Sequence, residues 1–245
     1  MNRGIYATSI GMIGLQRGLD VTANNLANAS TVGFKRDGLV FQDTLERKMF
    51  ANGGLGEEVG SLGSGANAVD QYTVQQAGAI TTTGNPFDMA IASHEGMFGV
   101  RVGDKTLYTR DGAFAIDDQR RLVTKSGYPV LDTEENEIVI PAGQMEVQTG
   151  GRILVGGNFI AQVGVFKPAG NAEFLKAGEN LYQVTGNAEP VANAQVTPGS
   201  LESSNVNAVE SMLDMVKIGR LFELSQKSIQ SQDELLQRLI SSLNE

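Results

Sequence analysis

The sequence contains no cysteine and no tryptophan, and a single histidine among its 245 residues. Without cysteine, neither a disulfide scaffold nor a thiolate metal site is available. Basic residues are outnumbered, because 19 Lys and Arg face 28 Asp and Glu and leave a formal net charge of −9. A general binder of nucleic acid or of an anionic membrane needs a basic face. The composition therefore argues against both classes, and we predict no nucleic-acid partner.

The sequence also lacks a run of about 18 apolar residues, the length that spans a bilayer. At the N-terminus, Arg3 precedes a stretch over residues 4–15 that faintly resembles a signal peptide. Tyr6, Thr8 and Ser9 weaken its apolar character, and no A-x-A-like cleavage site follows. We expect no membrane insertion and no cleaved signal peptide.

Glycine, in contrast, is abundant: the 30 glycines are nearly twice the average share. This composition favours turns and strands over a helical bundle. A chain of 245 residues can bury a sizeable core, in one large domain or in two smaller ones.

Short strand-like runs fill the middle of the chain, from residue 69 to residue 184. Turn signals such as Asp111-Gly112 and Ser126-Gly127 separate them. Many short strands at close intervals are typical of an all-β sandwich or a barrel-like domain. The expected runs are residues 90–92, 97–102, 107–109, 113–116, 122–124, 138–140, 145–148, 153–155 and 161–166.

Both ends of the chain carry apolar residues at intervals of seven. A strict repeat of seven keeps one apolar seam facing a partner if the helices supercoil left-handedly. Thr8, Thr22, Ser225 and Gln232 make the seams thin, which favours packing with several neighbours. Two ordinary amphipathic helices docked on a core fit the same periodicity equally well. The predicted assembly seam consists of Ile5, Met12, Leu19, Leu26, Met215, Phe222, Ile229, Leu236 and Leu243.

The first helix is predicted over residues 5–28 and ends in the stretch TANNLANASTVGFKR. Its three asparagines compete for backbone groups, which places them at caps and turns, and Gly33 supplies the freedom for a chain reversal. The last helix is predicted from about residue 206 to 243, with Ser204 or Asn205 as its N-cap.

These elements predict an α+β fold with a mainly β central domain of short antiparallel strands. Residues 1–35 with 205–245 are expected to form a terminal helical domain with a coiled-coil-like layer, and residues 69–184 the β-rich central domain. Residues 36–68 and 185–204 are expected to be extended linker arms. Within the first arm, residues 42–49 fit a short helix or an extended segment, and residues 51–67 read as a glycine-rich linker.

Four stretches carry a family resemblance. ANNLANASTVGFKR (residues 23–36) closely resembles the N-terminal signature of bacterial flagellar rod and hook proteins. TTTGNPFDMAI (81–91), LYTRDGAF with LVTKSGYPVL (107–131) and GSLESSNVNAVESMLDM (199–215) resemble further motifs of that family, in the family order. HEGMFGV (94–100) departs from the G-x-G-F-F-like turn that the family usually has. The first signature assigns the family motif to Asn24, Asn25, Leu26, Ala27, Asn28, Thr31, Gly33 and Phe34.

Within this basal-body rod family the chain resembles the FlgF/FlgG type, and the proximal-rod FlgF more closely. The resemblance implies a structural axial component of the rod that assembles helically through its terminal helices and carries torque from motor to hook. It implies self and other rod proteins as partners. It also implies an extracytoplasmic, periplasmic place in the basal body, reached through the flagellar type III export apparatus without signal cleavage.

Residues with possible chemistry have simpler structural explanations. His94 has no cysteine partner and no G-x-S-x-G nucleophile elbow, so we expect a surface or packing role. GSLGSG (60–65) lacks the strand-to-helix context of a phosphate loop. The acidic run 132–137 and Arg120-Arg121 are expected in solvated turns. We predict no catalytic residue, no metal and no cofactor. The alternative function, a secreted β-domain enzyme or carbohydrate-binding protein, is supported only by the β-rich centre.

Lys35, Arg36 and Asp37 follow the first helix. Charged groups at this position can pair with neighbouring subunits of an assembly. Cations there can equally complement the dipole at the helix C-terminus, which is worth about 0.3–1 kcal/mol. The sequence leaves both interpretations open.

Overall fold

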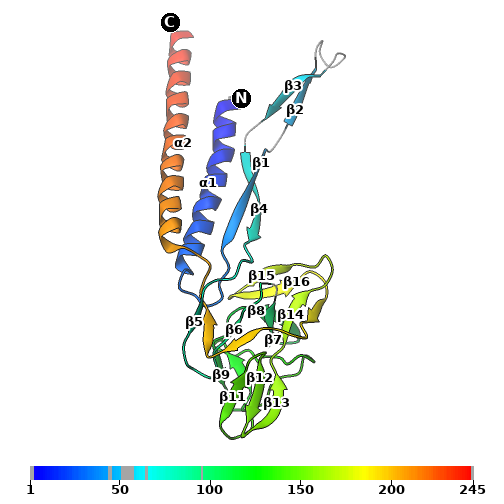
Figure 1. The fold of residues 1–245 in the computed structure, drawn as a ribbon. Helices are drawn as coiled ribbons and strands as arrows, with labels where there is room; N and C mark the ends of the chain where they lie inside the picture. Colours follow the sequence, from blue (N-terminus) through cyan, green and yellow to red (C-terminus); the bar gives the residue numbers. More distant parts are fainter. Residues whose placement is uncertain (1–2, 44–45, 51–57, 64–65, 95, 244–245) are drawn as a thin grey trace. The chain divides into compact units, whose positions relative to one another are not determined.

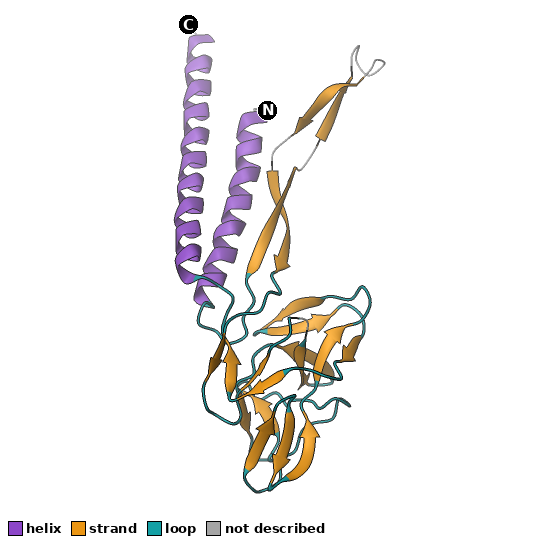
Figure 2. Cartoon of the chain, in the orientation of Figure 1, coloured by secondary structure: helices purple, strands orange, loops and turns teal. Residues whose placement is uncertain are grey.

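Two helices lie at the ends of the chain, α1 (Arg3–Ala27) and α2 (Ala208–Leu243), and strands and loops form the described residues between them (Figures 1 and 2). A computed structural model describes residues 3–43, 46–50, 58–63, 66–94 and 96–243. The helices match the expected boundaries to within two residues at each end. Neither one, over its described residues, combines the length and apolar character that a membrane-spanning helix needs.

The chain divides into two compact units. The helical unit comprises Met1–Ala27, Asp37–Tyr72 and Asn207–Glu245, and the β unit comprises Asn28–Arg36 and Thr73–Val206. Together they confirm the α+β fold, with helices at both termini and short antiparallel strands in the central region.

In the helical unit, α1 and α2 pack side by side in opposite directions (Figure 1). A Cβ added to Gly4 would lie 2.9 Å from the Gln232 side chain, and one added to Gly18 would lie 3.5 Å from Ile218. Residue numbers therefore rise along one helix as they fall along the other. Glycine on α1 leaves room for the larger side chains of α2.

The helical unit also holds two pairs of strands. β1 (Asp37–Asp43) pairs with β4 (Ala66–Thr73), and β2 (Glu46–Phe50) pairs antiparallel with β3 (Glu58–Gly63). The segment that fitted either a short helix or an extended arm is extended over its described residues. The glycine-rich segment is strand at residues 58–63 and 66–67, and its residues 51–57 and 64–65 lie outside the described residues.

The α2 N-terminus differs from the predicted cap. Asn207 Oδ1 accepts hydrogen bonds from the backbone N–H groups of Val209 and Glu210, at 3.1 and 3.3 Å. This is the bonding pattern of an N-cap, so the prediction of Ser204 or Asn205 was wrong. Ser204 instead accepts the N–H of Val206, and Asn205 makes other hydrogen bonds within the β unit.

The β unit is built on a six-stranded antiparallel sheet with the order β15-β16-β8-β7-β14-β17. Smaller sheets pair β11-β12-β13, β10-β9, β18-β6 and β19-β5. The strands of the large sheet are β7 (Met97–Val102), β8 (Lys105–Thr109), β14 (Val165–Pro168), β15 (Phe174–Gly178), β16 (Leu181–Val184) and β17 (Ala188–Pro190). The others are β5 (Ile80–Thr82), β6 (Met89–Ile91), β9 (Phe114–Ile116), β10 (Leu122–Thr124), β11 (Met145–Gln148), β12 (Arg152–Val155), β13 (Asn158–Gln162), β18 (Val196–Pro198) and β19 (Ser200–Glu202).

The large sheet is buried on both faces. Successive residues of a strand point to opposite faces, and here neighbours such as Met97 and Phe98 join different buried clusters. One cluster is the main aliphatic core. The other is mostly aromatic, with Tyr108 packed 5.2 Å from Phe174 and 5.7 Å from Phe166 between ring centroids. Burial on both faces explains the short continuous apolar runs in these strands.

Two expected strands differ from the observed ones. Residues 161–166 were expected as one strand but are divided between β13 and β14. Gly164 lies at the break, where a Cβ would approach the Asp132 carbonyl oxygen to 2.3 Å. Residues 138–140 form no regular strand: Val139 makes an isolated bridge with Arg121, and the Ile138 N–H donates to the Val130 oxygen at 3.2 Å. Residues 185–202, expected in a linker arm, contribute β17, β18 and β19 to the sheets.

Candidate functional site

The predicted assembly seam lies on the paired helices of the helical unit. On α2, half-buried side chains recur at alternating intervals of four and three: Met215, Ile218, Phe222, Ser225, Ile229, Gln232 and Leu236, following buried Ser211. This is the spacing that directs one helix face toward a partner helix. On α1, Ile5, Met12, Leu19 and Leu26 are also half-buried. The Leu243 side chain lies outside the described side chains.

The other faces of α2 expose large apolar side chains. Val209 is 67% exposed and Leu224 is 61% exposed, and further members are Met212, Leu213, Val216, Leu221, Leu235 and Ile240. A soluble monomer exposes single apolar residues routinely, but a long helix with so many of them has surface left for other helices. The pairing with α1 alone therefore does not cover the apolar surface of α2.

The family motif begins with a hydrogen-bonded pair in the helical unit. The buried Asn25 amide donates to the backbone oxygen of Asp37 at 2.8 Å and accepts the Asp37 N–H at 2.9 Å. The amide thus pairs with the backbone as a neighbouring strand would, and fixes the first residue of β1 beside the last turn of α1. Leu26 is half-buried, whereas Asn24 and Ala27 are exposed.

The remaining motif residues lie in the β unit. The Thr31 N–H and hydroxyl both donate to Asn28, each at 3.1 Å, which forms a turn. Gly33 has a φ of 67°, and a Cβ there would lie 2.5 Å from the Arg110 carbonyl carbon. Phe34 is buried, and the Lys176 ammonium lies 4.0 Å from its ring centroid in a cation–π contact.

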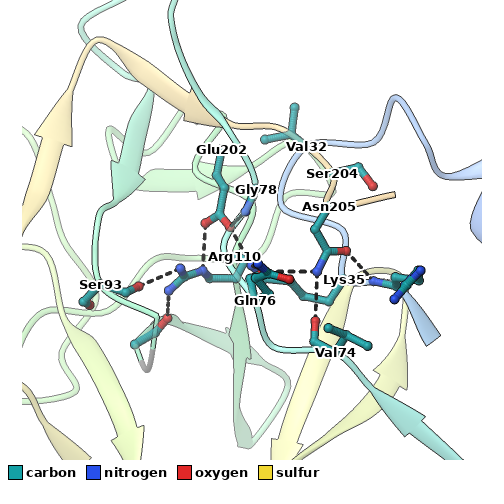
Figure 3. A network of polar contacts seen from close by, with 12 residues as sticks. Val32, Lys35, Val74, Gln76, Gly78, Ser93, Arg110, Glu202, Ser204 and Asn205 are labelled. Atoms are coloured by element: carbon teal, nitrogen blue, oxygen red, sulfur yellow. Dashed lines mark hydrogen bonds and ion pairs between the residues drawn. The ribbon is translucent and has the colours of Figure 1, made fainter. Parts of the chain in front are cut away.

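Next to this motif, three buried charged side chains form an ion cluster, defined as Lys35, Arg110 and Glu202 (Figure 3). Each side chain is only 1% exposed. Glu202 Oε1 accepts Lys35 Nζ at 2.5 Å, and Glu202 Oε2 accepts Arg110 Nε at 2.8 Å. One carboxylate therefore lies between two cations and uses a different oxygen for each.

Backbone groups satisfy the rest of the ion cluster. The Gly78 N–H donates to Glu202 Oε1 at 2.9 Å, and Lys35 Nζ also donates to the Gln76 oxygen at 2.9 Å. Arg110 donates to the carbonyl oxygens of Ser93, at 2.7 Å, and Gly96 (Figure 3). Buried charges need this degree of pairing, because removing one partner of a buried pair typically costs about 3–5 kcal/mol.

Asn205 extends the network. Its Oδ1 accepts the Arg36 N–H at 2.7 Å, and its Nδ2 donates to the oxygens of Val74 and Gln76, both at 2.9 Å (Figure 3). Its own N–H donates to the Phe34 oxygen at 3.3 Å. Asn205 and the ion cluster together hold three segments of the β unit: residues 33–36, 74–78 and 202–205.

Burial lowers the pKa of the Lys35 ammonium below its ordinary 10.5, and the nearby Arg110 charge lowers it further. The hydrogen bond and charge of Glu202 oppose both effects. This environment corrects both interpretations of Lys35, because its ammonium is paired with Glu202 and with the Gln76 oxygen inside the β unit. The backbone N–H groups of Arg36 and Asp37 are likewise held by asparagine side chains.

Arg110 and Glu202 were missed by sequence reasoning. Arg110 directly follows β8 in a stretch that reads as a turn, and Glu202 ends β19 within a polar segment. Glu202 lies 92 residues from Arg110 and 167 from Lys35, so no local spacing connects the three. A single glutamate in an otherwise uncharged stretch, residues 199–206, is the only available signal, and it does not identify its partners.

The residues with possible chemistry lie in turns and strands, where most have structural partners of their own. His94 is exposed, and the acidic run forms a turn in which Asp132 Oδ1 accepts the N–H groups of Glu134 and Asn136, both at 2.8 Å. Arg121 pairs with Asp117 at 2.9 Å. Residues 60–63 of the glycine-rich loop lie in β3, and the next described element is strand β4, not a helix. Among the described side chains, no group of three or more His, Asp or Glu is placed to hold a metal ion.

Three family models match the chain in order. "Flagella basal body rod protein" covers residues 5–35, "Flagellar hook protein FlgE/F/G D1 domain" covers 91–155, and "Flagellar basal body rod FlgEFG protein C-terminal" covers 197–242. Each member of the ion cluster falls in a different one of these regions. The first region also holds the family motif, and the last holds all of α2 except Leu243.

Whole-length relatives agree with these matches. The flagellar basal-body rod protein FlgG of Bacillus subtilis is 31% identical over 268 residues, which cover 98% of this chain and 99% of the relative. FlgF of Caulobacter vibrioides is 32% identical over 247 residues, which cover 99% and 98%. FlgF of Mesorhizobium japonicum is 28% identical over 248 residues, with 98% of each chain covered. The chain therefore belongs to the flagellar basal-body rod protein family, whose members are structural components of the rod.

Proposed function

We propose that this rod subunit assembles helically with copies of itself and with other rod proteins through α1 and α2, and so carries torque from motor to hook. The observation that supports the proposal most directly is the incomplete cover of α2. Its half-buried residues face α1, while eight large apolar side chains elsewhere on the helix are 50% exposed or more. Neighbouring helices in an assembly would remove that surface from water, which stabilises association by about 25 cal/mol per Å² of apolar surface.

Several finer features belong to the same proposal. We expect export through the flagellar type III apparatus without signal cleavage, a periplasmic place in the rod, and no catalytic activity. FlgF and FlgG relatives match at nearly equal identity, so the preference for the proximal-rod FlgF type rests on the resemblance of NLANAST (residues 25–31) and of RLFELSQKSI with the following Asp-Glu (residues 220–234). The division into a terminal helical domain, an arm over residues 36–68 and a β-rich domain from residue 69 also belongs to the proposal, with residues 185–202 counted in the β-rich domain because they supply β17, β18 and β19.

Substitutions on α2 test the proposal. Phe222 is half-buried in the predicted seam and Leu224 is exposed. Phe222→Ala and Leu224→Ser should each leave the β unit folded and the protein exported, but stop rod growth and swimming. Gln226→Ser, at an exposed polar position on the same helix, should swim normally.

The measurements are swimming of the mutant cell, recovery of rods, and the melting temperature of the purified monomer. Normal swimming of Leu224→Ser would contradict an assembly role for the exposed face. A Phe222→Ala monomer that melts many degrees lower would show that packing against α1 within one chain, and not assembly, explains the defect, because truncating a buried Phe typically costs about 3–5 kcal/mol.

A further inference from the structure

We propose that Glu202 makes the ordering of residues 33–36 and 74–78 conditional on the C-terminal segment of the β unit. In this view the ion cluster is a closing contact that forms last, when residues 199–206 arrive, and the large sheet of the β unit does not depend on it. The proposal concerns the interior of one chain and stands independently of how subunits assemble.

Charge is the first reason. Lys35 and Arg110 are both 1% exposed, and Glu202 is the only carboxylate that pairs with either of them among the described residues. Without Glu202 the same buried space would hold two cations and no anion. Desolvated like charges repel each other strongly, so the chain would leave this site open and keep both cations hydrated.

Chain order is the second reason. Glu202 follows Lys35 by 167 residues and Arg110 by 92. All six strands of the large sheet come before it and pair with one another rather than with residues 199–206. The sheet can therefore pair before Glu202 is in place, whereas the two cations cannot both be buried.

Backbone bonding is the third reason. Residues 202–205 supply three of the bonds that hold the segment after the family motif: the Glu202 backbone oxygen accepts the Gly33 N–H at 2.8 Å, Asn205 Oδ1 accepts the Arg36 N–H, and the Asn205 N–H donates to Phe34. Glu202 Oε1 also accepts the Gly78 N–H. Both N-terminal segments thus lose buried bonding partners when the C-terminal segment is out of place.

Hydrogen exchange on the full chain tests the proposal with Glu202→Gln, which removes the charge and keeps the shape. The matched control is Glu189→Gln, an exposed glutamate of β17. The Gly33, Arg36 and Gly78 amides should exchange at least about tenfold faster in Glu202→Gln than in the control, with amides of β7 and β8 changed by less than about twofold. Unchanged exchange at the three amides, or equal acceleration in β7 and β8, would overturn the proposal.

A double variant separates charge from shape. Lys35→Met with Glu202→Gln leaves one buried cation instead of two, so it should recover part of the protection that Glu202→Gln loses. If the double variant recovers no protection, repulsion between the two cations does not cause the loss of protection in Glu202→Gln, and the proposed role of charge is wrong.

Refolding of the unaltered chain provides a measurement that does not depend on any variant. After dilution from urea, pulsed hydrogen exchange should protect the β7 and β8 amides first and the Gly33, Arg36 and Gly78 amides later. Protection of these three amides together with the sheet, or before it, would refute the late closure.

Discussion

The backbone at Gly33 leaves no space for a side chain. Its φ is 67°, and a Cβ would lie 2.5 Å and 2.6 Å from the carbonyl carbon and oxygen of Arg110. Those atoms belong to the backbone that follows β8, so a larger residue cannot be accommodated by a rotamer change. The glycine lets the chain after α1 pass close enough to Arg110 for Lys35 to reach Glu202.

Lys35 gives a pH-dependent prediction. Because burial lowers its pKa below 10.5, there is a window below pH 10.5 in which the folded chain has released a proton that the unfolded chain still binds. The free energy of unfolding therefore rises with pH in that window. Lys35→Met lacks this contribution, so the wild-type free energy of unfolding minus that of the variant should increase from about pH 8 to about pH 10 in urea titrations.

The control for this measurement is Lys105→Met, which removes an exposed lysine from β8 in the same unit. Its difference from wild type should stay nearly constant over the same range of pH. A difference for Lys35→Met that falls with rising pH would mean that the Glu202 charge dominates the Lys35 ammonium.

For single residues, the sequence allows a prediction where the environment of the residue depends on its neighbours in the chain. The need for a glycine at a chain reversal can be read from the residues beside Gly33. The burial of Lys35 could not be predicted in this way, because a lysine just after a helix usually faces water, and its partner Glu202 is 167 residues away. Asn205 shows the same limit: its side chain prefers caps, but bonds to Arg36 and Val74 hold it elsewhere.

Among the elements, the start of α2 gives a second prediction. Asn207→Ala removes the acceptor for the Val209 and Glu210 N–H groups and should cost about 1 kcal/mol in the free energy of unfolding of the helical unit. Asn207→Asp keeps an acceptor and adds a negative charge near the helix N-terminus, so it should be neutral or stabilising.

Hydrogen exchange at Val209 and Glu210 reports the cap directly, and Asn207→Ala should accelerate both amides. Ser204→Ala serves as the comparison, because Ser204 accepts the Val206 N–H outside the helix. If Ser204→Ala accelerates exchange at Val209 and Glu210 more than Asn207→Ala does, Ser204 is the N-cap, as the sequence predicted.

The elements themselves were predictable to different degrees. The helices follow from a repeat of seven that persists over many residues, so both were located closely. Short strands carry less information: residues 161–166 look continuous, yet the close approach of Asp132 to Gly164 divides them. The strands after residue 185 were missed because they are short and two of them contain proline. Two of them, β18 and β19, also pair with strands far earlier in the chain.

For the whole molecule, net charge and apolar surface oppose each other. Copies of a chain with a net charge of −9 repel one another, while the exposed apolar side chains of α2 favour association. Salt screens the repulsion, so raising NaCl from about 0.05 M to about 0.5 M should increase the sedimentation coefficient of the purified protein.

Leu224→Ser should reduce this response, and Gln226→Ser should leave it unchanged. Dissociation on adding salt would show instead that ion pairs between copies hold the association together. Measuring at several protein concentrations separates association from a change in the shape of the monomer.

Gly18 of α1 lies against Ile218 of α2, and the chain has no cysteine. A disulfide engineered between these two positions would therefore report which α1 pairs with which α2. Cysteines introduced at both positions would be the only thiols in the protein. Oxidised in the monomer, they would close a loop within one polypeptide and leave its mass on a denaturing gel unchanged. Oxidised in an assembled rod, they would do the same if each α1 keeps its own α2. If neighbouring subunits exchange helices, the chains would instead be linked end to end and appear as a ladder of multiples.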